Sequence, residues 1–568
     1  YARFVEEQLA GDVLWPDDPA ATVATGFIAA GPWDYVGQVE LREGTTDKNI
    51  TRLLDRDDMV MTTMSTFVGM TAHCARCHDH KFDPIPQEDY YRLQAVFAGV
   101  DRADRPYDLD PKVHAARRPL LEKRRALLVQ LRPLQEQAAG VTSPELKKLD
   151  DTLTEIKSEF AQTQKAELQP RIAKLTADRK ATWQSLVSPE THQQIAGLTA
   201  AAQAIDQELD RLGKPQLVYA AANAFDPQGT FTFAAGPRPI ALLQRGSVES
   251  PGKPVGPGAL SCVASLVSRF AVQDTDPEGV RRAALAHWIT SPDNMLTWRS
   301  IVNRVWQYHF GAGIVDSAND FGHMGSQPTH PELLDWLAVT FRDRGRSNQG
   351  GSNQGGSIKQ LHKLILMSAT YRQGSANNPA NAQADSENRY LWRMNRQRLD
   401  AESVRDAVLS VSGKLDLTMG GPSAEQFWFK DDHSPTYDYA RFDIDSPASY
   451  RRSVYRFLVR SVPDPFMDSL DCPDASLITA KRNITITAIQ ALAQLNNPFM
   501  VRQAEHLAAR VTHLAAERDQ QIAWLYRLAL GRNPDGRETR RLAEFAAQHG
   551  LENAARAMLN TSEFLFVD

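Results

Sequence analysis

Hydrophobic residues recur with helical spacing over most of the chain. From residue 276 to the end, segments such as PEGVRRAALAHWIT and PELLDWLAVTFRDRG place apolar residues every three or four positions, with Pro, Ser or Asp at their starts and Gly at their ends. This pattern predicts a mainly helical C-terminal domain over residues 276–568. Residues 1–108 contain shorter helical stretches and turns, which predict a smaller helical domain.

Two intervening segments have a different character. Residues 109–215 are rich in Leu, Ala, Glu, Lys, Arg and Gln and predict a long helical hairpin or coiled-coil arm. Residues 216–275 combine β-branched and aromatic residues with Gly and Pro turn signals, which predict a small β-rich unit. The SNQGGSNQGGS insert at 347–357 has no apolar side chains to bury, and it predicts a flexible surface loop. The expected fold is therefore mainly α and multi-domain.

Composition narrows the class of protein. The 568 residues include 64 Lys and Arg and 69 Asp and Glu, a net charge of -5, which gives no reason to expect a nucleic-acid partner. No apolar run approaches the roughly 18 residues that a transmembrane helix requires, so we expect no transmembrane segment. The first residues have neither an initiator Met nor a signal-peptide pattern, and we expect a processed or trimmed chain that lacks its targeting segment.

The stretch TAHCARCHDHKFDP, residues 71–84, concentrates the side chains that bind metals. Within it, Cys74, Cys77 and His78 form C-x-x-C-H, the attachment signature of c-type haem. Two thiols separated by two residues on a helical turn can form thioethers with the two vinyl groups of one porphyrin, while the adjacent imidazole binds the iron as proximal ligand. The sequence predicts one haem c in this chain.

Two other chemistries could use the side chains of this stretch. A thioredoxin-like redox pair would follow a strand in a βαβ unit, whereas the sequence before this C-x-x-C is helical. A structural zinc site normally takes a second pair of ligands from elsewhere in the chain, but the other cysteines, Cys262 and Cys472, are isolated in the sequence. The zinc alternative would use His73, Cys74, Cys77, His78 and His80. Cys262 and Cys472 either form a disulfide or remain as two free thiols.

The distal side of the haem iron decides between electron transfer and substrate chemistry. His80 lies too close to His78 in the sequence to reach the opposite face of the ring, so we expect it to orient the loop by a hydrogen bond with Asp79 or Asp83. Methionines near a helix often fill core gaps, and a histidine before Pro can simply start a helix. The distal candidates are His330, His323, Met70 and Met64.

Acidic residues in the C-terminal half suggest a second kind of chemistry. Glu402 and Asp406 are four apart on a predicted helix, and Glu402 could act with Asp406 or with Asp320 as the acid and base of a hydrolase. Arg398 and Glu402 are also four apart and could form an ion pair on one helical face. The alternative to a catalytic role is salt bridging between helices. These three carboxylates are weak catalytic candidates.

Longer stretches resemble a known pair of domains. YARFVEEQLAGD and GMTAHCARCHDHKFDPIPQEDYYRLQAVFAGV are similar to the domain of unknown function 1549. Stretches similar to the domain of unknown function 1553 include MLTWRSIVNRVWQYHFGAGIVDSANDFGHMGSQPTHPELLDWLAVTF, LHKLILMSATYRQ, NRQRLDAESVRDAVLSVSGKLD and AMLNTSEFLFVD. These domains occur together in planctomycete proteins, commonly behind a cytochrome c module. The resemblance implies an exported haem protein, often from organisms that degrade complex polysaccharides, with no established reaction.

The function expected is that of a periplasmic or extracellular c-type haem protein in electron transfer. It would pass electrons to another haem module or redox protein, or work within a haem-dependent oxidoreductase that acts on carbohydrate. One alternative is a haem-stabilised binding or assembly protein, which could form oligomers through the arm. Another is a polysaccharide-active hydrolase with an accessory haem.

Overall fold

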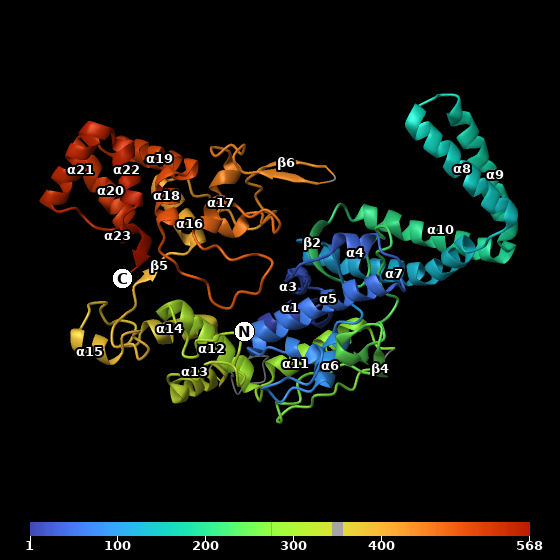
Figure 1. Ribbon diagram of the computed structural model, residues 1–568, viewed down its shortest axis with the longest axis horizontal. Coiled ribbons are helices and arrows are strands. Elements are labelled where there is room, and N and C mark those ends of the chain that lie inside the picture. The colour runs from blue at the N-terminus through green and yellow to red at the C-terminus, as the bar shows by residue number, and fades with distance from the viewer. Residues whose placement is uncertain (274, 344–355, 433, 568) are drawn as a thin grey trace. The chain divides into compact units, whose positions relative to one another are not determined.

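A computed structural model describes residues 1–273, 275–343, 356–432 and 434–567 (Figure 1). The described chain is mainly helical, and its strands form small antiparallel sheets of two strands each, which confirms the mainly α fold class. It divides into two compact units. The N-terminal unit holds Ala2–Met61 and Ala72–Asp293, and the C-terminal unit holds Tyr1, Thr62–Thr71 and the residues from Asn294 onward.

The N-terminal unit is built on short helices and one long one. Asp18 begins the second helix by accepting the amide hydrogen of Ala20, and Pro19 suits the first turn. The last helix of the unit, Glu278–Thr290, packs against the first, Ala2–Leu14. The sequence pattern places this last helix in the C-terminal domain, residues 276–568. The helices are α1 (Ala2–Leu14), α2 (Pro19–Ala24), α3 (Gly26–Ala29), α4 (Tyr35–Val39), α5 (Thr46–Thr63), α6 (Gln87–Val96) and α11 (Glu278–Thr290).

The region expected as a hairpin or coiled-coil arm contains four helices. They are α7 (Pro111–Ala139), α8 (Pro144–Thr163), α9 (Leu168–Leu186) and α10 (Pro189–Arg211). A capping Ser before Pro starts α8 at Ser143 and α10 at Ser188. Helix α7 packs against α10, and α8 packs against α9. A coiled coil stays a prediction.

The β structure is smaller than predicted. Strand β2 (Gln216–Ala222) pairs antiparallel with β1 (Asp101–Tyr107), which lies in the region expected to hold only helices and turns. The sequence DRADRPY has little strand propensity, so the strand was missed; it forms because Ala220–Ala222, which are fully buried, pair with its start. The other ladder here joins β3 (Ala241–Leu243) to β4 (Pro251–Pro254).

The C-terminal unit packs its helices around α16, α19, α20 and α22, whose apolar faces are buried together. Its helices are α12 (Met295–Phe310), α13 (Pro331–Asp343), α14 (Ile358–Leu366), α15 (Pro379–Ala384), α16 (Ala401–Ser412), α17 (Pro465–Ser469), α18 (Ala488–Asn496), α19 (Pro498–Leu514), α20 (Arg518–Leu530), α21 (Gly536–His549), α22 (Leu551–Leu559) and α23 (Ser562–Leu565). Two ladders join β5 (Gln397–Arg398) to β8 (Phe566–Val567) and β6 (Trp428–Lys430) to β7 (Thr436–Asp438). The predicted loop at 347–357 lies, apart from its last two residues, outside the described residues.

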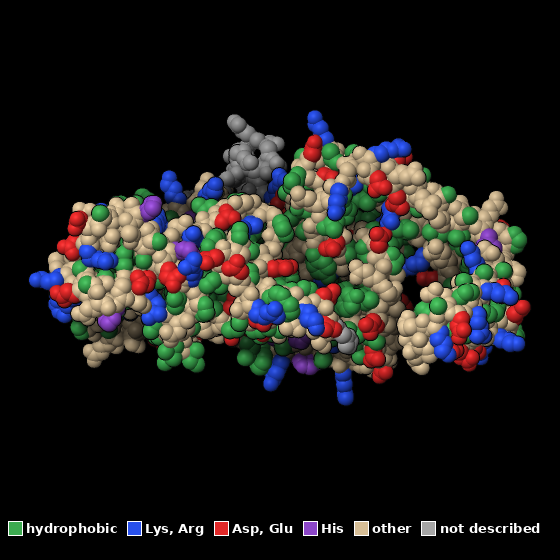
Figure 2. All heavy atoms as spheres, turned by 90° about the horizontal axis from the view of Figure 1, so that it is seen from above, with side chains coloured by type: hydrophobic (Ala, Val, Ile, Leu, Met, Phe, Trp, Pro, Cys, Tyr) green, Lys and Arg blue, Asp and Glu red, His purple; other side chains and the backbone are tan. Residues whose placement is uncertain are grey.

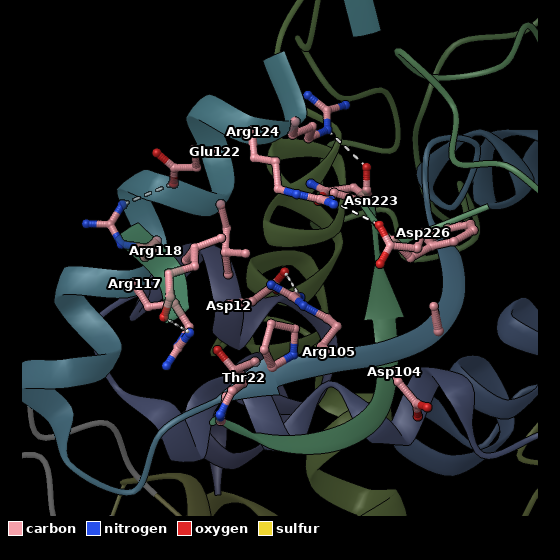
Figure 3. Close-up of a pocket in the computed structure, with 18 of the residues that line it drawn as sticks. Asp12, Thr22, Asp104, Arg105, Arg117, Arg118, Glu122, Arg124, Asn223 and Asp226 are labelled. Carbon is pink, nitrogen blue, oxygen red and sulfur yellow. Dashed lines mark hydrogen bonds and ion pairs between the residues drawn. The ribbon is translucent and has the colours of Figure 1, made fainter. Parts of the chain in front are cut away.

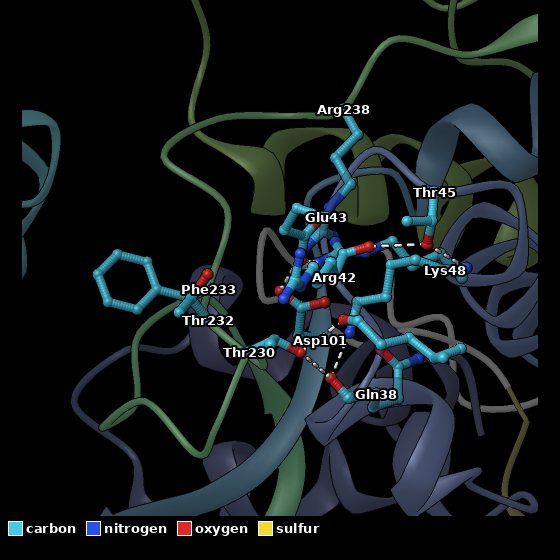
Figure 4. A network of polar contacts seen from close by, with 12 residues as sticks. Gln38, Arg42, Glu43, Thr45, Lys48, Asp101, Thr230, Thr232, Phe233 and Arg238 are labelled. Carbon is cyan, nitrogen blue, oxygen red and sulfur yellow. Dashed lines mark hydrogen bonds and ion pairs between the residues drawn. The ribbon is translucent and has the colours of Figure 1, made fainter. Parts of the chain in front are cut away.

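Polar side chains join the loop after β2 to the end of α4 (Figure 4). Lys48 is fully buried and donates to the carbonyls of Gly37 and Gln38. The Thr230 hydroxyl donates to the carbonyl of Leu41 at 2.6 Å, and the Thr230 amide donates to the carbonyl of Val39 at 2.7 Å. These bonds satisfy carbonyl groups at and beyond the end of α4 that the helix itself leaves without a partner.

The surface carries both signs of charge. Figure 2 shows Lys and Arg side chains interspersed with Asp and Glu over the face in view. Among the described residues, no helix has the length and apolarity needed to cross a bilayer.

A buried ion cluster joins α1 to α11. The Arg282 side chain, 1% exposed, lies 2.9 Å from Asp12 and 2.6 Å from Glu278, and it donates to the carbonyl of Leu9 at 2.8 Å. Arg105 approaches the same Asp12 at 2.7 Å. Burial alone raises the pKa of Asp12, but the guanidinium groups of Arg282 and Arg105 outweigh it and hold the pKa well below its usual range. The charges are buried only because they are paired.

Arg282→Met should therefore destabilise the N-terminal unit by about 3 to 5 kcal/mol, because two buried carboxylates lose their shared cation. A lowered midpoint of thermal unfolding checks this. The control is Arg118→Met, which removes an exposed pair with Asp17 and Glu122 and should cost less than about 1 kcal/mol. An equal loss of stability in the two variants would contradict the role of Arg282 as the cation that pairs with the buried carboxylates.

Candidate functional site

The C-x-x-C-H motif lies in the N-terminal unit on a short 3-10 turn, η2 (His73–Arg76), and Cys77 follows directly. Residues three apart eclipse one another in a 3-10 helix, so this turn brings Cys74 and Cys77 to one side. Both cysteines are exposed and neither forms a disulfide. The predicted helix before the motif is present, but it does not run into the motif. Helix α5 continues as a π-helical turn, η1 (Met64–Val68), which stops at Gly69, whose φ is +67°.

A buried carboxylate anchors this turn. Asp57 of α5 has a side chain 7% exposed; it accepts the Tyr90 hydroxyl at 2.6 Å and lies 3.1 Å from Nδ1 of His73. The Arg76 guanidinium lies 3.6 Å from the same carboxylate. The bond with Asp57 raises the pKa of His73 above its ordinary value. Residues on both sides of Cys74 are thus tied to one buried group.

The turn's backbone is held from the other side by α6 and β3. The Arg76 carbonyl accepts hydrogen bonds from Gln87 Nε2 and the Tyr91 hydroxyl, each at 2.9 Å. Gln87 Nε2 also donates to the carbonyl of Leu243 at 2.9 Å. Burial raises the pKa of Tyr91 to about 12, so its hydroxyl keeps its proton and remains a donor. The turn is therefore fixed to two neighbouring elements.

The His78 ring is oriented by its own neighbour. Its Nδ1 lies 2.6 Å from the carbonyl oxygen of Asp79. A carbonyl oxygen only accepts hydrogen bonds, so in the neutral ring Nδ1 carries the hydrogen and Nε2 has the lone pair. The Asp79 carboxylate accepts the amide hydrogen of Gln87 at 2.7 Å, which fixes this residue at the start of α6. The exposed His78 side chain can thus bind a metal through Nε2.

His80 has the loop-orienting role that the sequence predicts. Its ring is buried and its Nδ1 accepts the amide hydrogen of Asp83 at 2.9 Å, with the Asp83 carboxylate 3.3 Å away. The backbone amide of His80 also donates to the carbonyl of Ile85 at 2.9 Å. These contacts close the loop between η2 and α6.

The donor set fits haem c. Two accessible thiols on one turn and an imidazole with Nε2 available are the groups that covalent attachment and proximal ligation need. Gly246, with φ of +74°, faces the motif, and a Cβ atom there would lie 3.0 Å from Cys77 Sγ. The zinc alternative gains no support, because no group of three His, Cys, Asp or Glu side chains in the described ranges is placed to hold a metal ion.

All four distal candidates lie in the C-terminal unit. Met64 and Met70 are buried, 0% and 5% exposed, as core-filling methionines would be. His330 contacts the Thr329 hydroxyl at 2.9 Å and lies edge-on to Tyr390, while His323 is exposed. The distal ligand stays a prediction.

The three weak catalytic candidates have separate partners. Glu402 lies 2.9 Å from Nη2 of Arg482 and contacts its Nη1 as well. Asp406 accepts the amide and hydroxyl of Ser453, at 2.8 and 2.7 Å. Asp320 accepts the amide hydrogen of Gly322 at 2.9 Å. Each carboxylate thus has a local structural role.

The predicted ion pair of Arg398 with Glu402 is wrong. Asp400 caps α16, so the helix begins at Ala401 and Arg398 lies before it on β5. Arg398 instead reaches Gln490 at 3.0 Å.

The two remaining cysteines are free, half-buried thiols in different units. Burial raises the pKa of Cys262 to about 11, and it also raises the pKa of Cys472. Neither shares the accessibility of the motif cysteines.

Sequence reasoning missed the groups that hold the motif in place. Asp57, Tyr90 and Gln87 lie outside the C-x-x-C-H pattern, and no spacing rule links them to it. Only the packing of α5 and α6 reveals their role.

Comparison with known proteins identifies two families. Residues 1–102 match the family model PSCyt2, a protein of unknown function (DUF1549), and residues 281–546 match PSD1, a protein of unknown function (DUF1553). No curated protein and no solved structure matches the chain.

Asp57→Asn should loosen the motif, because the Tyr90 hydroxyl and the His73 and Arg76 side chains lose their charged partner. We expect faster hydrogen exchange of the amides of residues 73–78 and a stability loss of about 1 to 3 kcal/mol. Hydrogen-exchange mass spectrometry checks this. Asp47→Asn, an exposed change on the same helix, should leave both unchanged.

Thiol reactivity should separate the four cysteines in haem-free protein. At pH 8 a thiol with a pKa of about 11 is only about 0.1% thiolate, so Cys262 should react slowly with iodoacetamide. Cys74 and Cys77, both exposed, should be alkylated first. Peptide mass spectrometry over time gives the order, and faster modification of Cys262 would contradict the described burial.

Proposed function

This chain carries the paired domains of unknown function 1549 and 1553, and we propose that it is a c-type haem protein that transfers electrons. Cys74 and Cys77 attach the haem, and His78 is the proximal ligand of its iron. The observation that carries this proposal is the pair of free, exposed thiols one 3-10 turn apart, beside an imidazole whose Nδ1 is engaged by the Asp79 carbonyl.

Attachment needs two accessible thiols and no further reactant than the porphyrin. Each thiol adds across one vinyl double bond: sulfur forms a bond to one vinyl carbon, and the thiol hydrogen goes to the other. The bound iron would supply one-electron chemistry by changing between its ferrous and ferric states. No group of the protein needs to be oxidised for the attachment itself.

The protein's own residues position the attachment site. The Asp79 carbonyl accepts the Nδ1 hydrogen of His78, which orients the ring and fixes its tautomer. Asp57 holds the turn through His73 and Arg76, and Gly246 leaves room beside Cys77. These contacts hold the turn in place without using the thiols, so the site is preorganised for attachment.

The setting of the protein is part of the same proposal. Covalent haem is attached outside the cytoplasm, so we place the protein in the periplasm or outside the cell, with another haem module or redox protein as its partner. A role in an oxidoreductase that acts on carbohydrate rests on the family resemblance alone.

The test is the pyridine haemochrome spectrum of the purified protein and of single variants. The parent should hold one covalent haem. Cys77→Ala should keep one thioether and shift the absorption band to longer wavelength, because one vinyl group stays conjugated. His78→Ala should keep the covalent link, and the absorption spectrum of this variant recorded without pyridine should show the changed axial ligation. Cys262→Ala is the matched control and should leave the spectrum unchanged.

Two results would count against the proposal. Zinc instead of iron in the parent protein would show that the motif binds zinc and not haem. A haem that shows no reduced-minus-oxidised difference spectrum would remove electron transfer and favour the binding or assembly alternative.

A further inference from the structure

A cavity of about 990 Å³ lies within the N-terminal unit (Figure 3). Its walls come from α1, β1, β2, α7 and α10, together with residues 223–228 after β2. None of residues 74–78 lines it, so it is separate from the candidate haem site. Its volume is at the upper end of the range of organic ligand sites.

One face of α7 forms the long wall. His114, Arg117, Leu121, Arg124 and Leu128 line the cavity at intervals of three or four residues. Residues with this spacing share one face of a helix, and the fourteen-residue span corresponds to about 21 Å along the axis. The wall suits an elongated ligand better than a single small ion.

Arg125 brings a positive charge to this wall, and among the described residues no carboxylate forms an ion pair with it. Within the described part of the chain its hydrogen bonds go to backbone carbonyls: Nε donates to Asn223 at 2.9 Å, and Nη2 donates to Ala235 at 3.1 Å. A half-buried cation without an anionic partner is costly, and a ligand oxyanion would supply the partner.

The neighbouring Arg124 is paired, but with groups that a ligand can replace. Its Nε lies 2.7 Å from Asp206. Its Nη1 lies 3.1 Å from Asp226, and a dashed line in Figure 3 marks this pair. The Asp226 side chain is 80% exposed, whereas that of Arg124 is 26% exposed. An exposed ion pair contributes at most about 1 kcal/mol, so a bound oxyanion can displace Asp226 at little cost.

A buried polar atom in the same wall makes no hydrogen bond to any residue that the structure describes. His114 is 7% exposed and lines the cavity, and the atom is its Nδ1. Burial lowers the pKa of His114, so the ring is neutral near pH 7 and Nδ1 can accept or donate according to the tautomer. Leaving such an atom unpaired costs about 1 to 3 kcal/mol.

Apolar side chains complete the surface. Leu121, Leu128, Leu209 and Phe225 line the cavity between the polar groups. They can cover the carbon body of a ligand while the arginines bind its charged end.

From these observations we propose that the cavity binds an elongated organic oxyanion. Its acidic group pairs with Arg125 and Arg124, and its body lies along α7 towards His114. Carboxylate and phosphate ligands share this chemistry, and the experiment distinguishes them.

The test is isothermal titration calorimetry of the full chain at low salt with three probes. Digalacturonate carries carboxylates, ADP carries phosphates, and galactobiose is the uncharged match to digalacturonate. We expect at least one charged probe to bind with a Kd below about 1 mM and galactobiose not to bind.

Two variants and one control locate the site. Arg125→Gln should weaken binding of the charged probe about tenfold or more. Asp226→Asn removes the competing carboxylate from an exposed position and should tighten binding a few-fold without affecting the fold. Arg132→Gln is the matched control: Arg132 is also on α7 and donates to the Phe233 carbonyl, but it does not line the cavity, so binding should stay within about twofold.

The outcomes decide the proposal. No binding of either charged probe at about 5 mM, or unchanged affinity in both Arg125→Gln and Asp226→Asn, would overturn it. Equal affinity for galactobiose would show that the acidic group is not recognised. Each result is independent of whether the motif at residues 74–78 holds haem.

Discussion

The buried carboxylate of Asp57 is the constraint on which the motif depends. A charge enclosed by protein is stable only when it is paired, and here its partners are Tyr90 of α6 and two residues of the motif turn, His73 and Arg76. Burial and pairing therefore fix η2 against α5 and α6 together. The exposed thiols of Cys74 and Cys77 remain free to react, because their neighbours His73 and Arg76 pair with the buried carboxylate.

Local signals in the sequence predicted the local structure. Asp or Ser before Pro marks the starts of several helices, including α7 and α8, and the C-x-x-C-H spacing identified the cysteines that the fold leaves accessible. Strand β1 could not be predicted in this way, because its partner β2 lies more than a hundred residues away and burial of that partner, not local propensity, makes the strand. The start of α16 was also not predicted correctly. Asp400 caps this helix, so Arg398 lies outside the helix that holds Glu402.

The residues that hold the motif in place could not be predicted from the sequence, for a different reason. Asp55, Asp57 and Asp58 stand almost together on α5, and nothing in their order says which one faces the motif. In the structure Asp55 and Asp58 both pair with Arg102, and only Asp57 faces the motif. Helical geometry spreads residues that are neighbours in sequence over different faces, so the choice depends on what packs against each face.

Helix α7 shows how one periodic pattern can have two meanings. Leucines and arginines at intervals of three and four residues are typical of a helix that packs along one face, and they predict a helical hairpin or a coiled-coil arm. The structure puts arginines of this face opposite groups far along the chain: Arg124 meets Asp206, Arg117 meets the carbonyl of Gly213, and Arg125 meets that of Asn223. Part of this face, between residues 114 and 128, lines a cavity. The periodicity therefore identifies the face that is covered, and the identity of the covering groups, which only the fold provides, decides whether that face forms a core or a binding site.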